Sequence, residues 1–206
     1  MNTINTLSKD IIPVPDAETI YVSYFVQLGN GSVFKRMKPS AQWNFKTLYN
    51  YIKTNESAKN ATEYLRTLND EDKEKEFKAH NFDLIIPGGT LKTRQRGKNH
   101  VTPNGECCID VDHISVELRE SLFLDLIDDK VLDVDLMFRS PRGHGLKIFV
   151  RYNPDEISYK DFYTAVSNYL FFTYGVVADK ACSDITHACL IPWDDNAYIN
   201  SSIYGK

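Results

Sequence analysis

The stretch Glu106-Cys107-Cys108-Ile109-Asp110-Val111-Asp112 decides the fold, because it is a short apolar run that closes on two acids. Its composition predicts a strand over 106–112. Successive side chains of a strand point to opposite faces, so Asp110 and Asp112 are expected on the same face. Two carboxylates on one face repel each other unless a cation lies between them, which makes the pair a candidate hard-cation site. A solvated strand end is the ordinary alternative.

The segments after this strand predict an α+β fold. A helix capped by Ser115 is expected to run to about Asp129. The following pattern predicts strands over 131–139 and 146–152, a helix over 157–173 and a last strand near 187–193. This order is that of a ferredoxin-like or RRM-like antiparallel sheet with packed helices. It would place Asp110 and Asp112 at the exit of a central strand, beside the 139–147 hairpin.

The first third of the chain predicts a mostly helical lobe with one hairpin. The expected segments are an irregular arm over 1–18, a strand over 20–28 with a hairpin into 32–34, helices over 42–53, 58–68 and 71–80, and strands over 83–86 and 90–95. We therefore expect one domain over 19–200. Its N-terminal lobe is 19–82, the lobe with the candidate site is 83–200, and 201–206 is a tail.

Composition narrows the class of protein. With 206 residues, 42% of them hydrophobic, the chain is long enough for one sizeable core. Its net charge of −4 argues against avid, non-specific binding of duplex DNA. No stretch approaches the roughly 20 apolar residues of a membrane span, and the polar start lacks the pattern of a secretory signal. Four cysteines without a Cys-x-x-Cys pair fit a reducing compartment, so we expect a cytoplasmic protein.

Two further charge patterns lead to different expectations. Lys92, Arg94, Arg96 and Lys98 alternate along the chain, so an extended segment would present all four cations on one face. Such a row suits phosphates, although a solvated basic edge strand is an equally ordinary explanation. A second Asp-x-Asp pair, Asp133 and Asp135, stands at the entering end of its strand. We expect that pair to face solvent and to form no site.

Three motifs carry a family resemblance. They are Ile109-Asp110-Val111-Asp112, the hairpin from Ser140-Pro141-Arg142-Gly143 to Gly145-Leu146-Lys147, and Ala178-Asp179 ahead of Leu190-Ile191-Pro192. Their order and spacing resemble the three motifs of archaeo-eukaryotic primase-polymerases. More closely, they resemble the virulence-associated protein E N-terminal domain family of phage and mobile-element proteins, often fused to a helicase. The resemblance spans residues 75–200.

The resemblance implies a metal site and a nucleotide site. Asp110, Asp112 and Asp179 would hold Mg²⁺ or Mn²⁺ for nucleotidyl transfer, with Asp184 a rival of Asp179 as the third acid. The nucleotide would be contacted by Ser140, Arg142, Lys147 and His187. Lys147 departs from the family, which carries a histidine there; a lysine keeps a cation for phosphate, but only as a mobile point charge.

The leading functional hypothesis is a metal-dependent nucleotidyltransferase that resembles a DNA primase-polymerase domain. Its partners would be a single-stranded DNA template, nucleoside triphosphates and a helicase, either fused or separate. One alternative is a non-catalytic accessory domain that binds single-stranded nucleic acid, which the departure at Lys147 favours. The other alternative is a metal-dependent nuclease that uses the same carboxylates.

Overall fold

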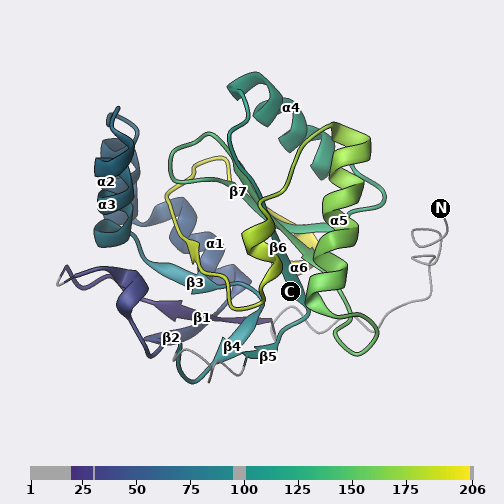
Figure 1. Ribbon diagram of the computed structural model, residues 1–206, viewed down its shortest axis with the longest axis horizontal. Helices are drawn as coiled ribbons and strands as arrows, with labels where there is room; N and C mark the ends of the chain where they lie inside the picture. The colour runs from purple at the N-terminus through teal and green to yellow at the C-terminus, as the bar shows by residue number, and fades with distance from the viewer. Residues whose placement is uncertain (1–19, 30, 95–100, 205–206) are drawn as a thin grey trace.

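The chain folds as a mixed α+β structure with antiparallel sheets, which confirms the predicted fold class (Figure 1). The computed structural model describes residues 20–29, 31–94 and 101–204. The helices are α1 Phe45–Thr54, α2 Glu56–Leu65, α3 Glu71–Asn81, α4 Val116–Ile127, α5 Tyr159–Tyr174 and α6 Ser201–Tyr204, with short 3-10 helices η2 Val33–Lys35 and η3 Lys180–Ser183. The strands are β1 Tyr21–Phe25, β2 Ala41–Asn44, β3 Leu84–Ile86, β4 Gly89–Leu91, β5 Val101–Pro103, β6 Glu106–Val111, β7 Val134–Arg139, β8 Leu146–Arg151, β9 Cys189–Leu190 and β10 Tyr198–Ile199.

The sheet that contains β6 has the strand order β10-β7-β8-β6. Its strands β6, β7 and β8 have the neighbours expected of a split βαβ unit, because β8 lies between the other two and is antiparallel to both. The segment predicted as the fourth strand takes a different partner. Its strand β9 pairs with β3 in a second sheet of order β2-β1-β3-β9. The strand ends at Leu190, ahead of Pro192, which cannot donate a ladder hydrogen bond. Cys189 and Ile191 bury their side chains against the second sheet.

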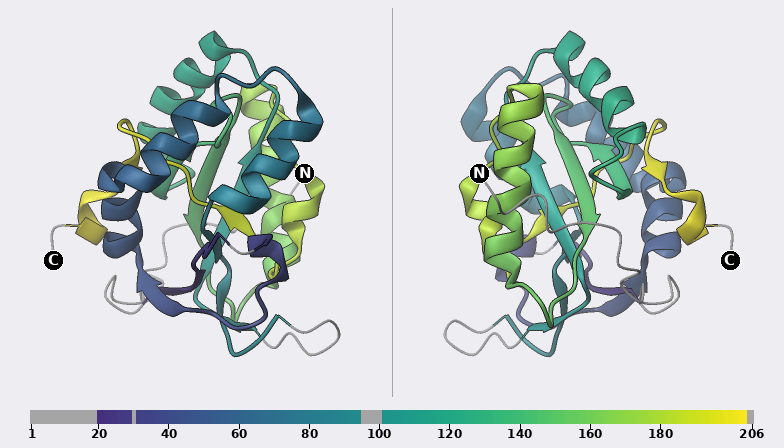
Figure 2. Two further views of the ribbon diagram at one scale, coloured as in Figure 1. Left: turned by 90° about the vertical axis from the view of Figure 1, so that its left-hand side faces the viewer. Right: turned by 90° about the vertical axis from the view of Figure 1, so that its right-hand side faces the viewer.

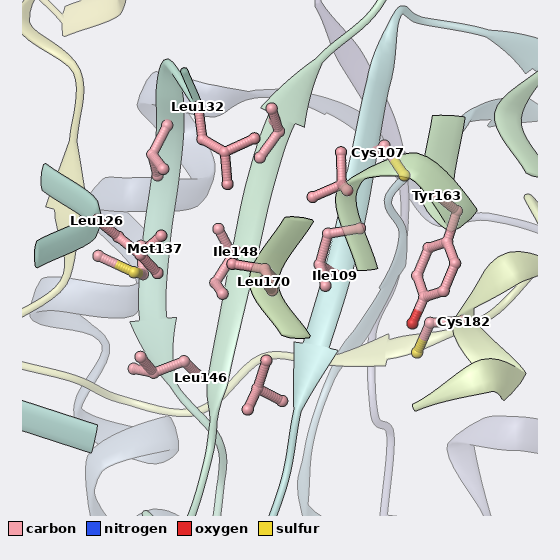
Figure 3. Packing of buried hydrophobic residues seen from close by; sticks show 14 of the residues in the cluster. Cys107, Ile109, Leu126, Leu132, Met137, Leu146, Ile148, Tyr163, Leu170 and Cys182 are labelled. Carbon is pink, nitrogen blue, oxygen red and sulfur yellow. The ribbon is translucent and has the colours of Figure 1, made fainter. Parts of the chain in front are cut away.

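Helices α4 and α5 cover one face of the β6 sheet. The side chains of Cys107, Ile109 and Val111 point to this face, as the alternation of the strand requires. Figure 3 shows this layer, in which Leu126 from α4 and Leu170 from α5 pack on the strands. Each fully buried aliphatic side chain contributes about 1.5–3 kcal/mol to folding.

The opposite face of the same sheet packs on the N-terminal lobe (Figure 2). Cys108 and Phe149 point to this side and meet Leu48 of α1 and Ile85 of β3. The sheet is therefore the middle layer between α4 and α5 on one side and α1 with the second sheet on the other. Glu106 and Asp110 have the parity of Cys108, so their side chains share the face toward the N-terminal lobe, and Asp112 follows the last residue of β6.

One sequence prediction is confirmed at the start of a helix. Ser115 caps α4, since its hydroxyl accepts a hydrogen bond from the backbone N–H of Leu118 at 3.2 Å. Helix α5 ends at Tyr174 and is capped by Gly175, which has a left-handed φ of 70°. Within residues 20–29, 31–94 and 101–204, no helix is long and apolar enough to cross a membrane.

The N-terminal hairpin was predicted wrongly. Residues 33–35 form the 3-10 helix η2, and the antiparallel partner of β1 is β2 at Ala41–Asn44. Asn44 then caps α1 by accepting a hydrogen bond from Thr47 N–H at 2.8 Å, so the helix begins later than the periodicity predicts. Strand β4 ends at Leu91, which leaves Lys92 and Arg94 outside any strand and removes the basis for a shared basic face.

The prediction for the second Asp-x-Asp pair is wrong at Asp135. Asp133 is exposed, but the side chain of Asp135 is buried and accepts a hydrogen bond from Arg151 Nε at 2.8 Å. Glu106, directly opposite Arg151 in the β6–β8 register, is fully buried beside them. Burial, followed by the charge of Asp135, raises the pKa of Glu106 well above its usual value. Two acids therefore share one arginine in the sheet interior, where burial favours keeping one of them protonated.

Candidate metal centre and its pocket

The two acids of the opening stretch line one wall of a pocket of about 460 Å³. Asp110 is 5% exposed and Asp112 is half-buried, so neither is a simply solvated strand end. The other walls come from the 140–147 hairpin, the 184–190 segment, α3 and η2. Both acids that were predicted to share one face therefore line this pocket, although Asp112 lies just beyond the end of β6.

Asp110 is paired with Lys147 across the sheet. The two residues are direct neighbours in the β6–β8 register, and Lys147 Nζ contacts Asp110 Oδ2. Among the described residues, the other oxygen, Oδ1, is buried without a hydrogen-bond partner. A buried carboxylate oxygen without a partner carries a desolvation cost. Oδ1 is therefore available to a cation while Lys147 contacts Oδ2.

Asp179 and Cys182 complete a cluster with Asp110. One ligand atom from each of the three lies within 4.8 Å of the others, which is close enough for a single ion. The backbone N–H of Asp179 donates to the Asp110 carbonyl at 2.8 Å, and Tyr163 Oη donates to the Asp179 carbonyl at 2.5 Å. Asp179 also caps η3, because its carboxylate accepts from Ala181 N–H at 3.0 Å. These bonds fix the third acid beside the end of β6.

The donor set fits a divalent cation with a preference for oxygen ligands. Two carboxylates suit Mg²⁺ or Mn²⁺, whereas a thiol is a softer ligand that Mg²⁺ takes poorly. Cys182 Sγ lies 3.9 Å from Asp110 Oδ2, and burial raises the pKa of this thiol to about 12. Cys182 is therefore protonated near pH 7 unless a metal binds to it. The described residues fit such an ion, with Asp110 and Asp179 as its charged ligands.

Asp112 stands beside this cluster and does not belong to it. Its Oδ1 lies next to Gly145, where an added Cβ would come within 2.5 Å of that oxygen. Burial raises the pKa of Asp112, and the charge of Asp179 acts in the same direction. The rival acid, Asp184, is exposed and accepts hydrogen bonds from the backbone and hydroxyl of Thr186. The structure thus brings two of the three predicted ligands together, with Cys182 as the third member.

Positive side chains surround the acids. Arg142 donates to Glu74 Oε2 at 2.9 Å, so an ion pair with α3 fixes its position at the pocket. Lys78 comes from the next turn of α3, and burial, with Arg142 second, lowers its pKa. Arg94 lies over the ring of Phe25, 5.5 Å from the centroid, and one of its buried nitrogens lacks a hydrogen-bond partner among the described residues. Arg142 and Arg94 are therefore held in place at the pocket, and Lys78 lines it beside them.

His187 and Ser140 are at the pocket as predicted. His187 is half-buried, and burial lowers its pKa, which keeps the imidazole neutral near pH 7. Ser140 is buried at the start of the hairpin, where its N–H donates to the Gly145 carbonyl at 2.8 Å. Of the four predicted basic contacts, Arg94 lines the pocket and Lys92 is exposed away from it. Arg96 and Lys98 lie outside the described residues.

Sequence reasoning missed two residues of the pocket and one member of the metal cluster. Lys78 and Phe34 come from α3 and η2, far from the motifs along the chain, and no local pattern marks them. Cys182 carried a weak signal, because it follows Asp179 by three residues and a single 3-10 turn brings such positions together.

Comparison with known proteins corrects the family. Residues 76–199, more than half of the chain, match a family model described as BT4734-like, N-terminal domain. No curated protein and no solved structure matches the chain. The resemblance to the virulence-associated protein E family and to primase-polymerases is therefore wrong as an identification, and the replication role it implied falls with it. Its motifs are short, and similar sites recur on unrelated folds.

Proposed function

The chain belongs to the BT4734-like N-terminal domain family, and we propose that it is a metal-dependent nucleotidyltransferase that acts on nucleoside triphosphates. The observation that carries the proposal is the cluster of Asp110, Asp179 and Cys182, in which Asp110 has an unpartnered Oδ1 among the described residues. Asp110 also lines the pocket that contains Lys78, Arg94 and Arg142. Carboxylates beside fixed cations suit a ligand that brings both phosphates and a divalent ion.

In the proposed reaction an acceptor hydroxyl attacks the α-phosphorus of the triphosphate. The new phosphorus–oxygen bond forms as the bond to the bridging oxygen breaks, pyrophosphate leaves, and the hydroxyl proton passes to solvent. A bound divalent ion supplies charge neutralisation and activation of the hydroxyl. Lys78, Arg94 and Arg142 bind the phosphates, and the neutral imidazole of His187 can donate or accept a hydrogen bond there. Single-stranded DNA with a free 3′-hydroxyl is the acceptor that we propose. Free buried cysteines and nucleotide substrates both support a cytoplasmic location.

A direct assay tests this proposal. The purified protein is incubated with nucleoside triphosphates and a single-stranded DNA acceptor in Mn²⁺ or Mg²⁺, and pyrophosphate release and acceptor length are measured. We expect Asp110→Asn to abolish both signals. The control is Asp155→Asn, at an exposed acid in the β8–α5 loop that does not line the pocket. Pyrophosphate release that survives Asp110→Asn would sink the assignment, and degradation of the acceptor without triphosphates would show a nuclease.

A second function is favoured by one specific contact. Lys147 already compensates the negative charge of Asp110. A domain that binds phosphates without a metal would need such compensation, because an uncompensated carboxylate repels phosphate. This alternative is non-catalytic binding of single-stranded nucleic acid at the same pocket. It predicts binding that weakens with salt, persists in a metal chelator and is not accompanied by pyrophosphate release.

A further inference from the structure

The pocket has a polar side and an apolar side. The polar side holds the acids of β6 with Arg142 and Lys147. The apolar side is formed by Phe34 of η2 together with Ala188 and Leu190 near β9. Ala188 and Leu190 pack against the cluster that includes Phe25, Leu84 and Ile86. A ligand that fills this pocket would therefore meet both charged side chains and hydrocarbon.

Phe34 is the aromatic side chain of that apolar side, and its exposure has no packing explanation. The ring is 45% exposed, whereas the preceding residue, Val33, is fully buried. The backbone beneath it is fixed: Ser32 Oγ accepts from Phe34 N–H at 3.3 Å, and the Ser32 carbonyl accepts from Lys35 N–H at 3.0 Å. No ring pair or cation–π contact within the described ranges includes Phe34.

We propose that Phe34 is the stacking surface for the base of the nucleoside triphosphate, an inference that rests on the proposed function. The phosphates lie on the polar side of the pocket, and the base lies flat on the ring of Phe34. Because every base has a π-face, this contact binds all four bases and leaves base identity unread. The site is thus specific for a nucleoside triphosphate as a class and tolerant of its base.

The test compares a ligand that has a base with one that has none. Calorimetry with the full chain in Mn²⁺ measures the affinity for ATP, for CTP and for inorganic tripolyphosphate. We expect Phe34→Ala to weaken ATP and CTP by about 5- to 150-fold and to leave tripolyphosphate unchanged. Phe34→Tyr should retain the wild-type affinities. Leu28→Ala is the matched control, because Leu28 is an exposed apolar side chain that does not line the pocket.

The outcomes separate the two proposals. If Phe34→Ala binds ATP as the wild type does, or loses ATP and tripolyphosphate equally, base stacking is overturned while the proposed function stands. If the wild-type protein binds none of the three ligands, the proposed function itself fails. Circular dichroism of Phe34→Ala checks the fold, and an exposed ring truncated in this way is expected to leave it intact.

Discussion

Replacing Lys147 by methionine tests how Asp110 is compensated. The side chains of Lys147 and Asp110 are 12% and 7% exposed, so methionine would fill the space and leave a buried carboxylate without its cation. Breaking a buried ion pair on one side costs about 3–5 kcal/mol. For a domain of this size, that loss corresponds to a fall in Tm of about 6–20 °C. The protein should remain folded, since domains of this class have about 5–15 kcal/mol of stability.

A metal should reverse part of that loss, because a cation on Asp110 replaces the missing ammonium. Free Mn²⁺ at a hundredfold excess over its Kd would restore about 2.7 kcal/mol to Lys147→Met. Urea unfolding of the variant, in chelator and in Mn²⁺, measures both quantities. The double variant Asp110→Asn with Lys147→Met removes both charges and should lie close to wild type in chelator, with no gain from Mn²⁺. A loss below about 1 kcal/mol for Lys147→Met alone would refute the buried pair, because exposed pairs are worth that little. A double variant no better than the single variant would contradict the coupling.

Three further predictions concern Glu106, Gly145 and Cys182. Burial raises the pKa of Glu106 above its ordinary value of 4.5. The contribution of this group to stability is therefore fully present below its unfolded pKa and is lost as the pH rises through its folded pKa. In urea titrations, Glu106→Gln should therefore be more stable than wild type at pH 8, and the difference should shrink toward pH 4.5. A variant less stable than wild type at pH 8 would mean that Glu106 is ionised and paired with Arg151. Gly145→Ala should cost about 1–3 kcal/mol of stability in urea unfolding, because its Cβ would come within 2.3 Å of the Val111 carbonyl oxygen and 2.5 Å of Asp112 Oδ1. Gly175→Ala is strained only by its left-handed φ of 70° and should cost about 1–2 kcal/mol; an unchanged stability of Gly145→Ala would contradict the close contact at Gly145. Cys182→Ser should shift the ratio of affinities toward Mg²⁺ and away from Mn²⁺ in calorimetry, since a hydroxyl is a harder ligand than a thiol, and an unchanged ratio would remove Cys182 from the ligand set.

Patterns that depend on neighbours along the chain were readable in the sequence. The alternation of 106–112 placed Asp110 and Asp112 on one face, and the structure puts both at one pocket. The cap at Ser115 and the helix after it followed from local hydrogen bonding. The glycine-rich turn at 140–145 followed from residues that tolerate a tight backbone. In each case the interactions responsible join residues only a few positions apart, so they can be read from one strand, one turn or one helix end.

What only the tertiary structure decided is which distant residues meet. The register of β6 against β8 set Lys147 opposite Asp110 and Arg151 opposite Glu106, and a shift by one residue would have paired neither. The same packing brought Asp179 and Cys182 to the strand end, turned Asp135 inward and carried Lys78 and Phe34 to the pocket from the N-terminal lobe. Those placements depend on burial shared between layers, and no stretch of sequence records such burial by itself. The sequence by itself therefore identified the two acids and predicted their common face. Tertiary packing decided which of the two joins a metal cluster and which cations lie beside them.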